Sequence, residues 1–163
     1  MRDIKTAIIV LIAICLAVEV FRHFERDQGR RRGLLTLVFL LYLCGVGYFV
    51  CFRGNRTDLG GVSVRFPGPF LKALMRASFG SVAQRSLLNI LLFVPFGYLL
   101  PQVKTLRWFQ VVGFGFLLSL MIEGSQLVFC FGVFELDDLA KNTMGAGIGF
   151  CLYALLDRLH GKK

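Results

Sequence analysis

The sequence predicts an all-α, polytopic membrane protein with about five transmembrane helices and one amphipathic helix in the membrane interface. The chain has 163 residues, of which 56% are hydrophobic and 18% charged, and its mean hydropathy is +0.67. A soluble protein of this size has too much surface for its volume to bury so many apolar side chains. The apolar residues also form long uninterrupted stretches, and Lys and Arg flank these stretches as they flank membrane spans.

Five apolar stretches predict membrane spans within a single domain covering 1–163, at 4–21, 34–52, 86–100, 108–131 and 142–157. The first resembles a signal peptide, but no small-x-small cleavage site follows it, so we expect an uncleaved anchor. Over 70–82, apolar residues recur at helical spacing with Lys72 and Arg76 largely on the other face, which predicts the interfacial helix. The third span is short and contains Pro95, which predicts that the helix is broken or kinked there, or that it is extended by the residues from Gln84.

The net charge of +9 does not indicate nucleic-acid binding, because the basic residues flank apolar stretches and form no patch on a soluble domain. Basic residues in that position are topology signals and contacts to anionic lipid headgroups, so the bilayer is the expected partner. The five cysteines lie in or beside apolar stretches, with neither a CxxC pair nor the spacing of a zinc site or a disulfide framework. We expect them to be packing residues and expect no cofactor or metal.

Basic residues also predict the orientation in the membrane. With five spans, the Arg cluster at 30–32, the basic turn 101–107 and the basic tail all fall on one side, which we expect to be cytoplasmic. Asp137, Asp138 and the long connection 53–85 then face the other side, although that connection is itself basic.

Six polar residues of the second half are candidates for a functional site: Asn89, Glu123, Gln126, Asp137, Asp138 and Asn142. Because consecutive spans run in opposite directions, all six approach the same membrane face. Glu123 lies about 12 Å below the end of its predicted helix, at a depth where a carboxyl group must be protonated, paired or hydrated. Arg85 and Lys141 are its possible partners. The structural alternative is that the aspartates cap the last helix while the amides bond neighbouring helices.

Three motifs resemble the VanZ-like family: NILLFVPFGYLLP at 89–101, IEGSQ at 122–126 and FELDDLAKNTMGAGIG at 134–149. The resemblance covers about 86–157, and it carries over the six polar residues with Pro95, Gly97 and Gly145, without assigned roles. The family often has an Arg shortly before the aspartates, where this chain has Gly132. The resemblance implies a small bacterial cytoplasmic (inner) membrane protein of the cell envelope. The name-giving member accompanies glycopeptide-resistance genes and raises tolerance to teicoplanin.

Three functions are compatible with these features. The first is a non-transporting envelope protein that binds a lipid-like or lipid-linked ligand in the polar pocket, with the interfacial helix gating entry. The second is an intramembrane carboxylate-dependent hydrolase or transferase acting on a lipid phosphate, in which Glu123, Asp137 and Asp138 hold Mg²⁺ or act as acid and base. HExxH and GxSxG motifs are absent from the sequence, and no His belongs to the polar group. The third, a channel or transporter, requires oligomers because no inverted repeat is evident.

Overall fold

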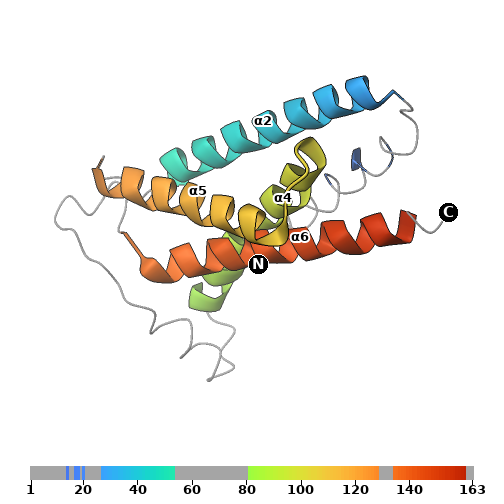
Figure 1. The fold of residues 1–163 in the computed structure, drawn as a ribbon. Coiled ribbons are helices and arrows are strands. Elements are labelled where there is room, and N and C mark those ends of the chain that lie inside the picture. Colours follow the sequence, from blue (N-terminus) through green and yellow to red (C-terminus); the bar gives the residue numbers. More distant parts are fainter. Residues whose placement is uncertain are drawn as a thin grey trace.

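Four long helices make up most of the part of the chain that the structure, a computed structural model, describes: residues 14, 17, 18, 20, 27–53, 81–128 and 134–160. The helices are α2 (Gln28–Arg53), α4 (Ser81–Val103), α5 (Trp108–Val128) and α6 (Leu136–His160) (Figure 1). Each contains a segment long and apolar enough to cross a membrane. The described residues therefore confirm an all-helical chain with four candidate spans.

Helices α4 and α6 run parallel and touch through glycine. Gly145 of α6 lies against the carbonyl oxygen of Ile90, and Gly149, one turn later, lies against that of Val94. A methyl group at either glycine would overlap backbone atoms of α4. Close backbone contact of this kind is a main source of helix association in lipid, where apolar side chains gain little by leaving their surroundings.

Ala146 is the point where three helices meet. Gly97 of α4 lies against its carbonyl group, and a Cβ at Gly115 of α5 would be 2.6 Å from its methyl carbon. Helix α5 runs antiparallel to α6. Gly115 lies against Ala146, and Ser119, one turn later on α5, bonds Asn142, one turn earlier on α6. The small residues at this junction hold α5 and α6 close enough for their polar side chains to bond directly.

Helix α2 packs against the other side of α4 and runs antiparallel to it. The Tyr42 hydroxyl donates a hydrogen bond to the Leu92 carbonyl oxygen, and the rings of Phe39 and Phe96 lie 5.7 Å apart. One core cluster joins the first predicted span to these helices through Val18, Leu35, Tyr98 and Leu99. Large apolar side chains elsewhere on α2 and α5 are exposed, which is the arrangement of a helix bundle surrounded by lipid.

Three helices begin earlier than the predicted spans, and α4 does so at Ser81 instead of 86. Helix α2 starts at Gln28 instead of 34, because Asp27 caps it by accepting a 2.9 Å hydrogen bond from the Gly29 amide. Helix α6 starts at Leu136 instead of 142, so Asp137 and Asp138 lie in its first turn and not in a preceding loop. Carboxylates complement the positive end of a helix dipole, which makes the first turn a favourable place for them.

The predicted break in the third span is wrong, whereas the alternative that this span includes the residues from Gln84 is confirmed. Helix α4 continues from Ser81 to Val103 through both Pro95 and Pro101, and only the residues just before α5 form a turn. Proline is tolerated inside membrane helices because neighbouring groups compensate for the missing hydrogen bond. The first span, at 4–21, lies largely outside the described residues, and the interfacial helix at 70–82 overlaps them only where α4 begins, so both remain predictions.

Candidate functional site

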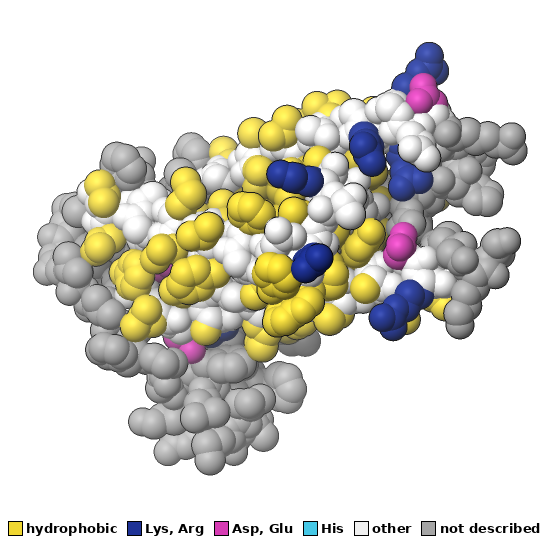
Figure 2. Space-filling view, viewed as in Figure 1, with side chains coloured by type: hydrophobic (Ala, Val, Ile, Leu, Met, Phe, Trp, Pro, Cys, Tyr) yellow, Lys and Arg dark blue, Asp and Glu magenta, His cyan; other side chains and the backbone are white. Residues whose placement is uncertain are grey.

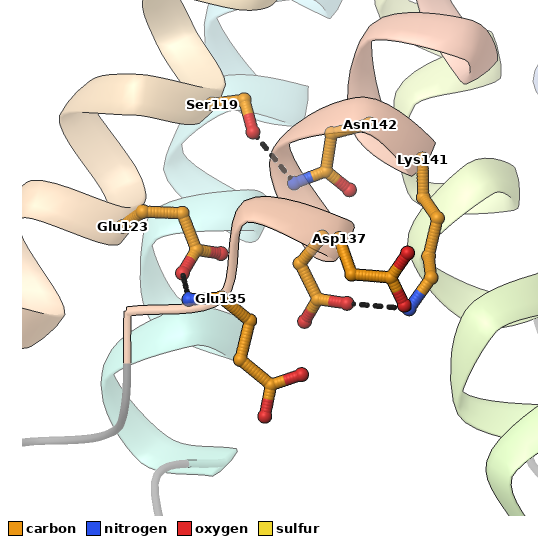
Figure 3. Close-up of polar contacts among 7 residues, drawn as sticks. Ser119, Glu123, Glu135, Asp137, Lys141 and Asn142 are labelled. Carbon is orange, nitrogen blue, oxygen red and sulfur yellow. Dashed lines mark hydrogen bonds and ion pairs between the residues drawn. The ribbon is translucent and has the colours of Figure 1, made fainter. Parts of the chain in front are cut away.

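The polar residues predicted from the sequence gather where α5 ends and α6 begins. Figure 3 shows side chains of both helices meeting at this junction, with the backbone of Glu135 just before α6. Together with Asp138, which bonds Lys141, these residues are what we call the polar cluster: Ser119, Glu123, Glu135, Asp137, Asp138, Lys141 and Asn142. Most of these polar residues are buried, and they lie on helices that are otherwise largely apolar. Polar groups at such a position are costly unless they bond one another, so their contacts determine what the cluster can do.

A buried ammonium group is the centre of the cluster. Lys141 Nζ lies 2.9 Å from Asp137 Oδ2 and 2.8 Å from Asp138 Oδ1, and only 6% of the Lys141 and Asp137 side chains is exposed. These are contacts between positions three and four residues apart on one helix, so they form as soon as α6 does. The triad carries two negative charges against one positive charge.

Glu123 is bonded differently from the sequence-based expectation. Its carboxylate Oε2 accepts a hydrogen bond of 3.1 Å from the backbone amide of Glu135, just before α6. The glutamate is 4% exposed. Lys141, one of the two partners expected for it, is engaged by the aspartates, and the Arg85 side chain lies outside the described part. The bond ties the last third of α5 to the start of α6 without neutralising the carboxyl group.

Asn142 joins the helices and leaves one acceptor unused. Its Nδ2 donates a 2.9 Å hydrogen bond to Ser119 Oγ, and both residues are buried. Its Oδ1 is also buried, and it has no hydrogen-bond partner among the described residues. An unsatisfied buried amide oxygen is unfavourable, so this atom favours a donor from outside the described protein groups.

The remaining two predicted site residues are less closely engaged. Asn89 lies on α4 next to Ile90, which contacts Gly145, and this places it at the same end of the bundle as the polar cluster. Gln126 lies one turn beyond Glu123 on α5, and the side chains of Asn89 and Gln126 are half-buried. No hydrogen bond joins either residue to the cluster within the described part of the chain.

Two contributors to the cluster were missed or given the wrong contact. The backbone amide of Glu135 carries no signal in a sequence, because any residue there supplies one. Lys141 was one of two possible partners for Glu123, yet it pairs within α6, with Asp138 and Asp137 three and four residues before it. The spacing did not predict an ion pair, because the predicted span began at 142 and left all three residues outside the helix. Gly132, where the resemblance to the VanZ-like family implies an Arg, lies outside the described residues.

An apolar groove runs beside the cluster along the contact of α5 and α6. It has a volume of about 740 Å³, and its walls include Val112 and Phe116 from α5 and Leu136, Thr143 and Met144 from α6. Leu136 and Leu139 of its wall flank the aspartates in the sequence, but the residues of the polar cluster do not themselves line the groove. An apolar surface of this size on the same two helices as a group of buried polar atoms suits a ligand that is itself amphipathic, as a lipid is.

The described residues do not bring three His, Cys, Asp or Glu side chains together in the manner of a metal site. The carboxyl groups of Asp137 and Asp138 instead converge on Lys141. The Mg²⁺ arrangement considered from the sequence is therefore not preformed by this part of the chain.

Comparison with known proteins gives the same relationship as the motifs. The family model described as VanZ/LLP1 matches residues 34–157, which is most of the chain and includes the whole polar cluster. "Protein VanZ" of Enterococcus faecium is 33% identical over 76 residues, covering 46% of this chain and 47% of that protein, so the chain spans about half the length of this relative. No solved structure matches. The chain belongs to the VanZ/LLP1 family.

Proposed function

We propose that this protein binds a lipid-like or lipid-linked amphiphile at the polar cluster and thereby contributes to tolerance of teicoplanin-type glycopeptides. The observation that carries the proposal is the buried Oδ1 of Asn142, which has no partner among the described residues, in a polar cluster on the same two helices as a large apolar groove. Teicoplanin tolerance is what resemblance to the VanZ-like family implies. The setting we propose is the bacterial cytoplasmic membrane, with five spans and the 70–82 helix at the interface.

The charges of the cluster favour a particular headgroup. Four carboxyl groups, those of Glu123, Glu135, Asp137 and Asp138, accompany a single ammonium group. A ligand with hydroxyl or ammonium donors would satisfy the open acceptor of Asn142 and reduce the excess negative charge. An anionic headgroup without donors would meet repulsion instead. We therefore propose a donor-rich headgroup at the cluster, with its hydrocarbon chain in the α5–α6 groove.

A second candidate rests on the single hydrogen bond of Glu123. A buried carboxylate that accepts one backbone bond at 3.1 Å retains lone pairs for a proton, which a general base requires. This favours the alternative of an intramembrane carboxylate-dependent hydrolase or transferase acting on a lipid phosphate. Release of phosphate or of a diacylglycerol from a lipid substrate by the purified protein would distinguish this alternative from binding alone.

The proposed function predicts the effect of Glu123→Gln. Glutamine keeps the shape and can still accept the Glu135 hydrogen bond, but it removes the charge that attracts a donor-rich headgroup. We expect the variant to reach the membrane at the wild-type level and to lose the teicoplanin tolerance that the wild-type chain confers on a susceptible bacterium. The measurement is the minimum inhibitory concentration at matched abundance, determined by blotting the tagged protein.

Asp27→Asn is the matched control. It also removes one carboxylate, but from an exposed position at the other end of the bundle, and asparagine caps a helix as well as aspartate does. This variant is expected to retain full tolerance. If Glu123→Gln at equal abundance is as tolerant as Asp27→Asn, the charge of Glu123 has no functional role and its hydrogen bond is structural.

A further inference from the structure

A second cavity lies at the opposite end of the bundle from the polar cluster. Its volume is about 200 Å³, roughly that of six water molecules in the liquid. Three parts of the chain line it: Arg31 and Arg32 near the start of α2, Gln102 and Thr105 around the end of α4, and Tyr153 and Asp157 near the end of α6. In Figure 2, Lys and Arg side chains gather over this end of the molecule.

The two arginines of the cavity occupy an electrostatically unfavourable place. They lie near the N-terminus of α2, where a helix dipole favours negative charge, and the first turn of α2 contains no acidic residue. Asp27, the residue that caps α2, pairs with the preceding arginine: its Oδ2 lies 3.8 Å from Arg30 Nε. Arg31 and Arg32 form no ion pair within the described part of the chain. An anion in the cavity would be stabilised by both guanidinium groups and by the helix terminus.

Gln102 adds a second requirement. Its Nε2 donates a 3.0 Å hydrogen bond to the Tyr98 carbonyl oxygen, while its Oε1 is buried and has no partner among the described residues. An oxygen in that state favours a hydrogen-bond donor. Thr105, whose hydroxyl group donates as well as accepts, lines the same cavity. The cavity thus offers sites for an anion and for a neighbouring hydroxyl group.

We propose that this cavity binds a phosphate group that carries a hydroxyl-bearing substituent, as in the headgroup of phosphatidylglycerol. The phosphate oxygens bond Arg31 and Arg32 at the start of α2, and a ligand hydroxyl donates to Gln102 Oε1. Asp157 offsets one of the two positive charges, which leaves a net excess of one positive charge on the wall. The site is separate from the polar cluster, so it stands whether or not the function proposed there is correct.

The test uses the purified full-length chain in a neutral detergent. Its thermal unfolding midpoint is measured against added phosphatidylglycerol, diacylglycerol with the same acyl chains, and soluble glycerophosphoglycerol. We expect phosphatidylglycerol to raise the midpoint and diacylglycerol to leave it unchanged. The double variant Arg31→Gln/Arg32→Gln is expected to raise the half-maximal concentration by about tenfold or more, because a charged hydrogen bond contributes at least that factor.

Lys104→Gln/Arg158→Gln is the matched control, since it removes the same charge from exposed residues near the same end that do not line the cavity. Its half-maximal concentration should change by less than about twofold, as expected for exposed, screened charges. Asp157→Asn should lower the half-maximal concentration of phosphatidylglycerol, because it removes the negative charge from the cavity wall. If the arginine double variant does not fold, Arg32→Lys replaces it, with a smaller increase expected from the loss of bidentate geometry.

The outcomes separate the possible ligands. Arginine-dependent stabilisation by glycerophosphoglycerol at the same concentrations as the lipid would identify a soluble phosphate as the ligand of this cavity. Stabilisation by phosphatidylglycerol alone would identify the lipid. Equal losses in the two double variants would show only general attraction between basic residues and anionic lipid, and would overturn the proposal. An equal effect of diacylglycerol would overturn it as well.

Discussion

Replacing Lys141 with methionine is expected to destabilise the protein by about 3–5 kcal/mol, the usual result of removing one member of a buried ion pair. Methionine has a similar length and helix propensity, so the change removes charge with little change in packing. The Asp137 side chain is 6% exposed and lies 2.9 Å from the ammonium group. Without Lys141, two adjacent carboxylates remain at the buried start of α6, and no other cation of the described residues pairs with them.

The measurement is the thermal midpoint in detergent, followed by the fraction of protein that elutes as a single species after heating. Lys104→Met is the control, because Lys104 is an exposed lysine just after α4. We expect it to change stability by less than about 1 kcal/mol, as exposed charges usually do. A Lys141→Met protein as stable as Lys104→Met would contradict a charged, buried triad.

A triple variant separates charge from packing. If the loss in Lys141→Met comes from uncompensated carboxylates, then adding Asp137→Asn and Asp138→Asn should restore a large part of it. Replacing every member of a buried ionic group is often nearly neutral, whereas removing one member is not. No recovery in the triple variant would indicate that the aliphatic stem of Lys141 matters more than its charge.

The second large effect is expected at the contact of α4 and α6. At Gly149, a Cβ atom would collide with the Val94 carbonyl oxygen and lie 2.8 Å from the Tyr98 amide nitrogen and 2.9 Å from the Gly97 Cα. All three are backbone atoms, which cannot rotate away. Gly149→Ala must therefore push the two helices apart, and overpacking of this kind costs about 1–3 kcal/mol.

Gly113 of α5 provides the matched control, because nothing lies within 4 Å of the Cβ position there. Gly113→Ala is expected to be neutral or to stabilise by up to about 1 kcal/mol, since alanine favours the helix. The two substitutions add the same methyl group and should shift the midpoint in opposite directions. Equal shifts at the two positions would contradict the direct backbone contact of α4 and α6.

The helical, membrane-spanning character of the chain is predictable because hydropathy alone identifies long apolar stretches. The residues at which the helices start are not predictable in this way, because a hydropathy criterion leaves out first turns that contain charged residues. Arg30 and Asp137 are helical, yet both were assigned to loops. The error at α6 had a further consequence. Because the predicted helix started at 142, Asp137 and Lys141 both lay outside it, and their four-residue spacing was not recognised as that of an ion pair within one helix.

For the candidate site, the residue types were predictable from the sequence, whereas most of their contacts were not. Glu123 and Asn142 could be selected from the sequence because polar groups in an apolar helix are costly, and the structure places both between α5 and α6. The backbone partner of Glu123 and the open oxygen of Asn142 depend on how two helices meet, which no local pattern contains. The arginine-lined cavity is of the same kind, since α2, α4 and α6 form it together.

Photo-crosslinking in the native membrane tests most directly whether the polar cluster and its groove bind a particular amphiphile. A benzophenone amino acid replaces either Met144, which lines the groove, or Met121, an exposed methionine of α5 that does not. Mass spectrometry of the intact protein then identifies the captured lipids. We expect Met144 to capture a lipid with hydroxyl or ammonium donors several-fold above its share at Met121, and Asn142→Leu to abolish that enrichment. Identical lipid profiles at the two positions would contradict a ligand site in the groove.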